Sequence, residues 1–102
     1  MSDDRQLLTV TARDERLELV GELDAASVAV LNAALASRNS KGATLDLSGL
    51  TFIDSMGLHA IVDYAKSHDV TVTVTGASTH ILRVFEITRL TEHPNLRVNG
   101  TA

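Results

Sequence analysis

Alternating apolar and polar positions predict two strands at the start of the chain. Leu8, Val10 and Ala12 alternate with threonine, a pattern typical of a half-buried strand. Apolar or small residues recur at every second position of the next segment, at Leu17, Leu19, Gly21 and Leu23. The charged stretch 13–16 between the two segments suits a solvated turn. We therefore expect the first two strands to form a hairpin.

Helical spacing follows directly after the second strand. Val28, Leu31 and Leu35 recur at helical intervals, and Asp24 stands in front of them. Asp is a favoured N-cap residue, so we expect Asp24 to cap a helix that reaches about Arg38. The polar residues 39–42 then end this helix.

The remaining sequence alternates between strands and helices. Ala43, Leu45 and Leu47 predict a strand that Ser48–Gly49 breaks. The next segment predicts a helix that ends near His68, with an apolar face of Leu58, Ile61, Val62 and Ala65. A strand with Val70, Val72 and Val74 follows, and then a third helix whose buried side is Ile81, Leu82, Phe85 and Leu90. The last predicted element is a short strand at Leu96–Val98. The order β-β-α-β-α-β-α-β predicts an α/β fold with a mixed sheet of about five strands and about three helices. The sheet is expected to combine one hairpin with parallel crossover units.

The amino-acid composition excludes several classes of protein. A chain of 102 residues, 44% hydrophobic and with one proline, is typical of a single globular domain spanning 1–102. The absence of cysteine excludes disulfides and thiolate chemistry. A net charge of −4 and the absence of tryptophan argue against nucleic acid as a partner. Short apolar runs and an acidic amino terminus predict a cytoplasmic protein with no direct membrane insertion.

Spacing also argues against an enzyme. The histidines at 59, 68, 80 and 93 lie on different segments or too far apart to share a metal ion. The glycines never approach a dinucleotide or P-loop spacing, and no GxSxG elbow occurs. We therefore expect no catalytic residues, no metal and no cofactor.

One candidate site lies at Asp54–Gly57, between a buried strand and an amphipathic helix. This position places the Ser55 hydroxyl at a helix N-terminus, where Asp or Ser commonly serves only as a cap. The alternative is that Ser55 is phosphorylated, since free N–H groups and the helix dipole accommodate a phosphate there. No Lys or Arg occurs between Lys41 and Lys66. A phosphate would therefore add about −1.5 to −2 charges next to Asp54, and at a partner contact would cost about 3 kcal/mol or more.

The neighbours of Ser55 allow two interpretations each. Met56 is either core or rim filler or a binding contact. Gly57 is either a tolerated first-turn glycine or a point of close backbone approach. Glu22 and Asp24 are either a solvated strand end and an N-cap, or contact residues at a chain turn.

The sequence resembles the STAS domain family of sulphate transporters and anti-sigma factor antagonists. The resemblance rests on the run LDLSGLTFIDSMGL at 45–58 and on VGELD at 20–24, and covers roughly residues 7–98. It implies a bacterial anti-sigma factor antagonist that binds an anti-sigma factor when unphosphorylated and so frees the sigma factor. It further implies that a partner serine kinase phosphorylates Ser55 and that a separate serine phosphatase reverses this. By motif position, the implied partner-binding residues are Glu22, Asp24, Asp54, Met56, Gly57 and Leu58.

Three features depart from the family pattern. Met56 stands where many members have Ser or Thr, and Arg89 where many have Gly. The C-terminal helix common in anti-sigma factor antagonists is expected to be missing, since only residues 99–102 follow the last strand. This short ending also suits a second STAS subgroup, the accessory subunit of a lipid-transport ABC complex, which docks on an ATPase without a phosphorylation cycle.

Overall fold

The alternating segments at the start of the chain form the predicted hairpin. In the computed structural model, which describes residues 7–38, 41–89 and 92–99, β1 (Thr9–Arg13) pairs antiparallel with β2 (Arg16–Leu23). The remaining elements are α1 (Val28–Ala36), β3 (Ala43–Ile53), α2 (Ser55–His68), β4 (Val72–Thr75), α3 (Thr79–Thr88) and β5 (Leu96–Val98). The expected order of strands and helices is confirmed, although β4 begins at Val72 rather than Val70.

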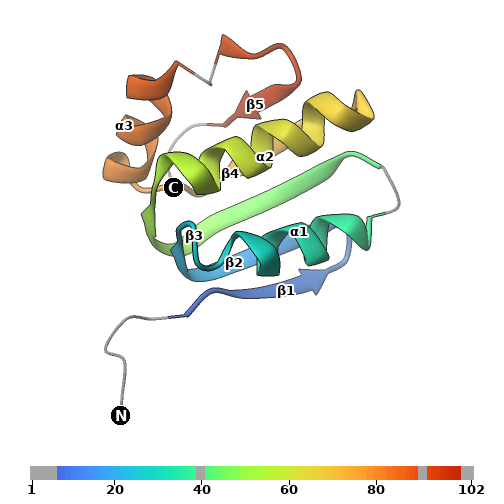
Figure 1. The fold of residues 1–102 in the computed structure, drawn as a ribbon, viewed down its shortest axis with the longest axis horizontal. Coiled ribbons are helices and arrows are strands. Elements are labelled where there is room, and N and C mark those ends of the chain that lie inside the picture. The colour runs from blue at the N-terminus through green and yellow to red at the C-terminus, as the bar shows by residue number, and fades with distance from the viewer. Residues whose placement is uncertain (1–6, 39–40, 90–91, 100–102) are drawn as a thin grey trace.

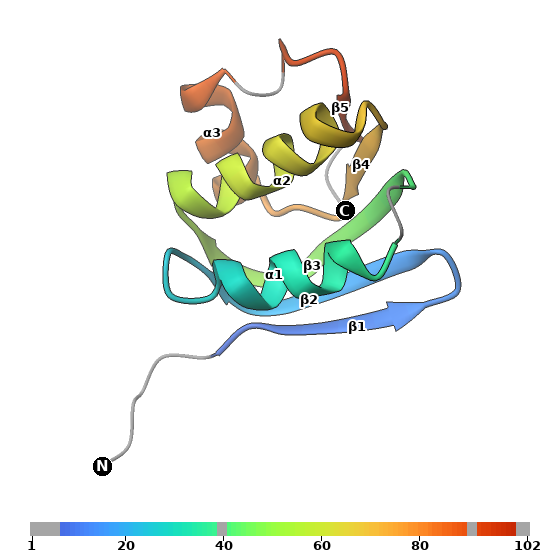
Figure 2. The ribbon, with the colours of Figure 1, turned by 45° about the vertical axis from the view of Figure 1, so that its right-hand side comes forward.

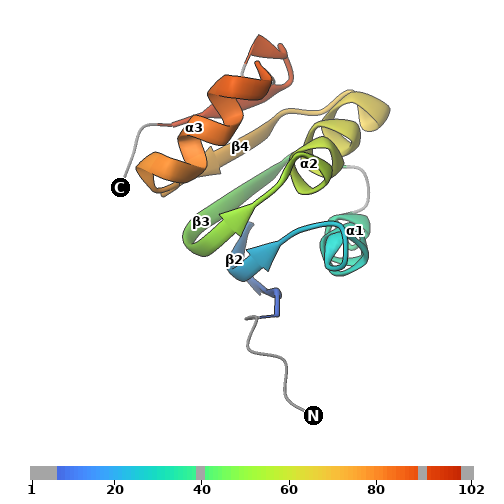
Figure 3. The same cartoon turned by 60° about the vertical axis from the view of Figure 1, so that its left-hand side comes forward.

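The five strands lie in the sheet in the order in which they occur in the chain, β1-β2-β3-β4-β5 (Figures 1 and 2). Every pair after the hairpin is parallel, so each helix connects neighbouring parallel strands. Helices α1 and α2 lie on the same side of β2 and β3 (Figure 3). This confirms the mixed sheet of a hairpin followed by parallel crossovers.

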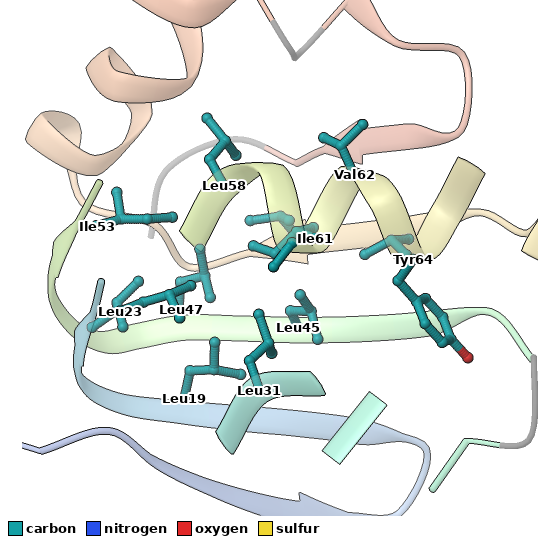
Figure 4. Packing of buried hydrophobic residues seen from close by; sticks show 14 of the residues in the cluster. Leu19, Leu23, Leu31, Leu45, Leu47, Ile53, Leu58, Ile61, Val62 and Tyr64 are labelled. Atoms are coloured by element: carbon teal, nitrogen blue, oxygen red, sulfur yellow. The ribbon is translucent and has the colours of Figure 1, made fainter. Parts of the chain in front are cut away.

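The apolar stripes of the helices meet the apolar face of the sheet. Figure 4 shows Leu19, Leu45 and Leu47 of the strands close to Leu31 of α1 and Ile61 of α2. These five side chains are completely buried, as are Ile81 and Phe85 of α3. Leu90, also predicted to be in the core, lies outside the described residues. The other face of the sheet is polar, with partly or fully exposed side chains that include Thr11, Glu18, Thr44, Asp46 and Thr73.

The first helix begins later than the sequence predicts. Asp24 does not cap it: the Ser27 N–H donates to Asp24 Oδ1 (3.1 Å), and the Asp24 N–H donates to Ser27 Oγ (2.9 Å). These reciprocal bonds close a turn, and α1 starts only at Val28 and ends at Ala36, short of Arg38. The prediction of the N-cap was wrong because the Asp24 side chain bonds to the backbone of the loop before the helix. Asp and Ser side chains commonly form such local bonds in place of a helix cap.

The third strand does not break at Ser48–Gly49. It continues through eleven residues because it contains two bulges. Between the pairs Glu18–Asp46 and Val20–Gly49, β3 contains one residue more than β2. It contains one more again between the pairs Gly21–Leu50 and Glu22–Phe52. The bulges keep Leu50 and Ile53 in the core. At the first bulge, hydrogen bonds from the Ser48 N–H and hydroxyl hold the pKa of Asp46 below its usual value.

The end of α3 explains why glycine suits position 89. Arg89 is the C-cap residue and adopts a left-handed conformation with φ 60°. This conformation is unfavourable for a residue with a Cβ atom and neutral for glycine. We expect Arg89→Gly to raise the free energy of unfolding by about 1 kcal/mol, measured by urea denaturation. A lower stability of this variant would show that Arg89 makes a compensating contact.

Candidate functional site

The candidate site lies where β2 and β3 end side by side and α2 begins. The Asp54 N–H donates to the Leu23 carbonyl (3.1 Å), so the residue after β3 is bound to the last residue of β2. In parallel sheets, the loops at the carboxyl ends of neighbouring strands gather at one edge, where ligands and partners commonly bind. The structure therefore places the loops that carry Asp24 and Ser55 next to each other.

Asp54 caps α2. Its backbone is extended (φ −115°, ψ 179°), and its Oδ1 atom accepts a hydrogen bond from the Gly57 N–H (3.0 Å). Its carbonyl accepts the first helical hydrogen bond, from the Leu58 N–H (3.0 Å). Ser55 is thus the first residue of a 14-residue helix, and it is exposed. Because Asp54 provides the cap, the Ser55 hydroxyl is not needed for that purpose.

Gly57 allows the first turn of α2 to lie against the end of β2. A Cβ atom at this position would lie 2.5 Å from Leu23 Cγ and 3.0 Å from the Leu23 carbonyl oxygen. The first distance is shorter than side chains tolerate. Of the two interpretations of Gly57, the structure therefore supports close approach.

A Gly57→Ala substitution tests this packing. We expect it to lower the free energy of unfolding by about 1–3 kcal/mol, the usual range for overpacking a well-packed core. Urea denaturation measures the effect, and Ser55→Ala, an exposed position in the same helical turn, is the matched control. Equal stability of the two variants would contradict the close approach.

The loop after β2 is held rigid by one buried serine. Ser27 is 9% exposed, and its hydroxyl donates to the Glu22 carbonyl (2.9 Å), across the turn that it forms with Asp24. Glu22 and Asp24 are themselves half-buried. The loop is therefore ordered by internal hydrogen bonds, and it begins at Leu23, whose carbonyl is bonded to the residue that precedes α2.

Some of the predicted contact residues are exposed to solvent, and others are buried. Met56 is 57% exposed, so it is not core filler, and Ser55 is exposed as well. Gly57 is buried and Leu58 is 0% exposed. Figure 4 shows Leu58 on the side of α2 opposite to Ile61, so it packs away from the strands. A direct partner contact through Gly57 or Leu58 does not fit this burial, and both residues instead shape the turn that presents Ser55 and Met56.

Sequence reasoning missed one apolar residue at the site. Phe52 lies opposite Glu22 at the end of the sheet and is 44% exposed. The signal was present, because neighbouring residues in a strand point to opposite faces, which places Phe52 opposite Ile53. Two histidines also lie close, with His59 Nδ1 2.7 Å from the Ser55 carbonyl oxygen and His80 Nε2 3.1 Å from that of Thr51.

A shallow groove runs from the site along the seam between α1 and α2. It has a volume of about 370 Å³, and Met56 and His59 line it near the site while Tyr64 and His68 line it near the far end. Val28 and Leu35 of α1 contribute apolar lining. The groove thus continues the partly apolar surface of Met56.

Within residues 7–38, 41–89 and 92–99, no group of three or more His, Asp or Glu side chains is placed to hold a metal ion. No helix in this part of the chain has the length and apolar character needed to cross a membrane.

Comparisons with known proteins identify the family and the fold to which this chain is similar. The model of the family described as "Mlab, STAS domain" matches residues 8–98. An anti-sigma factor antagonist from Mycobacterium paratuberculosis is 22% identical, with a TM-score of 0.66 over 94% of this chain and 88% of that one. The antagonist SpoIIAA matches in its unphosphorylated form (14% identity, TM-score 0.61, 93% and 89% covered) and, from Bacillus, in its phosphorylated form (16%, 0.61, 91% and 91%). No curated protein matches the chain significantly. At these identities the solved structures show a shared fold.

Proposed function

Because the chain belongs to the STAS domain family, we propose that it is an anti-sigma factor antagonist whose binding is controlled by phosphorylation of Ser55. The observation that carries this proposal is the position of the Ser55 hydroxyl. It belongs to the first residue of α2, it is exposed, and Asp54 already provides the cap. A kinase can reach it without unfolding the domain.

The start of α2 is suited to a phosphate. The first N–H groups of a helix have no partner within the helix, and the helix dipole favours negative charge at this end. A phosphate on Ser55 would meet this positive end, so we expect the domain to stay folded after modification. The change would therefore be one of surface charge rather than of fold.

The same phosphate would oppose a partner docked on this surface. In the unphosphorylated protein, Met56 and Phe52 offer exposed apolar contacts near Ser55. Glu22, Asp24 and Asp54 already supply carboxylates around them. A phosphoserine at the contact would add charge that the partner must desolvate or repel, which weakens binding.

The chemistry belongs to the partner proteins. An anti-sigma factor kinase would transfer the γ-phosphoryl group of ATP to Ser55 Oγ, forming the O–P bond as ADP leaves and removing the hydroxyl proton. A serine phosphatase would hydrolyse that ester to restore the hydroxyl and release inorganic phosphate. In this scheme the chain is a substrate and a ligand, not an enzyme.

Intact-mass measurement after incubation with a co-encoded kinase and ATP tests the proposal. We expect one added phosphate, which is lost in Ser55→Ala. Ser67→Ala is the matched control, since Ser67 is exposed in the same helix at its other end. A phosphate that persists in Ser55→Ala, or no phosphate with any co-encoded kinase, would overturn the proposal.

The family description favours a second candidate, because it names Mlab rather than an anti-sigma factor antagonist. In that case the same exposed surface would dock on the ATPase of a lipid-transport complex. The two candidates differ in the phosphorylation test, because only the first requires a phosphate on Ser55. They also differ in genomic neighbours: genes for a kinase and a sigma factor indicate the first candidate, and genes for a permease and an ATPase indicate the second.

A further inference from the structure

A second group of polar side chains lies at the opposite ends of the parallel strands, where β3 and β4 begin. Arg38, Lys41, Thr44, Thr71 and Thr73 line a shallow pocket of about 330 Å³, together with Gly42, Ala43 and Glu15. We call this group of residues the basic pocket. Ser55 lies two residues after the last residue of β3, whereas Thr44 is close to its first, so the basic pocket is separate from the candidate site.

Strand register places three further cations at this end of the sheet, outside the lining of the basic pocket. Arg13 pairs with Arg16, Arg16 with Thr44, Thr44 with Thr73, and Thr73 with Arg97. Paired positions on neighbouring strands point to the same face of a sheet, so these residues form one row across all five strands. With Arg38 and Lys41, this end of the domain holds five of the chain's nine Lys and Arg residues, although the chain carries a net charge of −4.

Carboxylates on the same face offset part of the repulsion between these cations. Like charges placed directly opposite each other on paired strands destabilise a sheet, as Arg13 and Arg16 are here. Arg13 is relieved by its ion pair with Glu18, at 3.0 Å. Arg16 and Arg97 are exposed on the same row. Arg16 also interacts favourably with the Asp46 carboxylate on the same face. A bound anion would add to this attraction.

Arg38 provides the second observation. Its Nε atom is buried and has no hydrogen-bond partner among the described residues. Buried polar atoms almost always have a partner, and one without a partner in the protein commonly binds an ion or water. A guanidinium group is suited to phosphate because its N–H groups match two phosphate oxygens.

The backbone around Lys41 is fixed in place. The Lys41 N–H donates to the Arg38 carbonyl (3.1 Å), which holds the two cations on one turn. The Tyr64 hydroxyl donates to the Lys41 carbonyl (2.7 Å), and burial raises the pKa of Tyr64, so the phenol stays protonated and keeps this bond. Lys41 is thus anchored beside the threonines at the start of β3 and β4.

We propose that the basic pocket binds a phosphate group, through Arg38 and Lys41 and with hydroxyl donors from Thr44 and Thr73. The proposal does not rest on the proposed function, because Ser55 takes no part in it. Glu15 is the one carboxylate that lines the pocket among the described residues, and it opposes an anion. The phosphate can belong to a soluble molecule or to a lipid headgroup, since the chemistry at the pocket is the same.

Titration of the full chain with inorganic phosphate, followed by amide NMR shifts at constant ionic strength, tests the proposal. We expect a saturable shift of residues in and next to the basic pocket, which chloride does not produce. Arg38→Gln and Lys41→Gln should each weaken the affinity by about tenfold or more, because each removes a charge-assisted contact. Glu15→Gln should strengthen it.

Lys66→Gln is the matched control, since Lys66 is an exposed cation in α2 that is not part of the pocket. It should leave the affinity unchanged, and thermal unfolding of each variant checks that it is folded. A saturable shift that Lys66→Gln reduces as much as Arg38→Gln does would overturn the proposal.

Vesicles distinguish the two sources of the phosphate. Cosedimentation with phosphatidylcholine vesicles that contain phosphatidic acid, but not with pure phosphatidylcholine, and its loss in Arg38→Gln would assign a lipid headgroup. Saturable binding of inorganic phosphate without cosedimentation would assign a soluble phosphate. Absence of both would refute the proposal.

Discussion

A Ser55→Asp variant is expected to bind the anti-sigma factor of the proposed function at least about a hundredfold more weakly than the unmodified protein. An uncompensated charge placed in a contact costs about 3 kcal/mol or more, and each 1.4 kcal/mol is a factor of ten in affinity. The new carboxylate would lie beside Met56 and close to the carboxylate of Asp54 at the start of α2. Titration calorimetry with the partner measures the change.

The control for this charge is Ser67→Asp, which adds the same group to an exposed position at the other end of α2. It should bind the partner as the unmodified protein does. The Ser55→Asp variant should also unfold at a temperature close to that of the unmodified protein, since a carboxylate in the first helical turn is favourable. Unchanged affinity in Ser55→Asp would show that charge at this position does not control binding.

Leu58→Ala is expected to have the largest effect on stability at the site. Leu58 is completely buried between α2 and the rest of the core, and Leu→Ala substitutions at such positions cost about 2–5 kcal/mol. Urea denaturation measures the loss of unfolding free energy. A loss well below this range would mean that the core closes around the smaller side chain.

Met56→Ala is the counterpart that separates packing from contact. Met56 is 57% exposed, so its removal should change stability by less than about 0.5 kcal/mol. If Met56 contacts the partner and Leu58 only supports the turn, Met56→Ala weakens binding without loss of stability. Leu58→Ala lowers the stability, but it binds the partner with unchanged affinity under conditions where the variant is folded. Equal effects of the two variants on affinity would contradict this division.

The fold was predictable where local pattern decides it. The alternation in β2 and the helical spacing of α2 and α3 were sufficient to predict these elements, because each buries one regular face. The start of α2 was predictable for the same reason, since a buried strand, a capping Asp and an apolar helical stripe follow one another. The position of Ser55 therefore followed from neighbours in sequence.

Leu58 shows how two arguments from the same sequence can disagree. Helical spacing placed Leu58 on the buried face with Ile61, whereas resemblance to a family placed it on the partner-facing turn. The structure agrees with the spacing. A motif marks a segment, but the helical period determines which of its side chains reach the surface.

Features that depend on distant residues were not predictable. The bulges of β3 arise from its pairing with β2, and they turned an apparent break at Ser48–Gly49 into a continuous strand. The turn of Asp24 with Ser27 is local, but the same residue types also suit a helix cap, so the pattern did not distinguish the two. The basic pocket depends on the pairing of β3 with β4 and on the position of Arg38, and its residues show no motif in the linear sequence.

The order of the strands in the sheet bears on how the domain is made. Because every strand pairs with the strand that precedes it in the chain, each new strand–helix unit can add to an edge that already exists when it leaves the ribosome. No strand has to be inserted between two others that have already paired, so no completed pairing must open again. The sheet can therefore grow in one direction during synthesis, with the three residues of β5 closing it last.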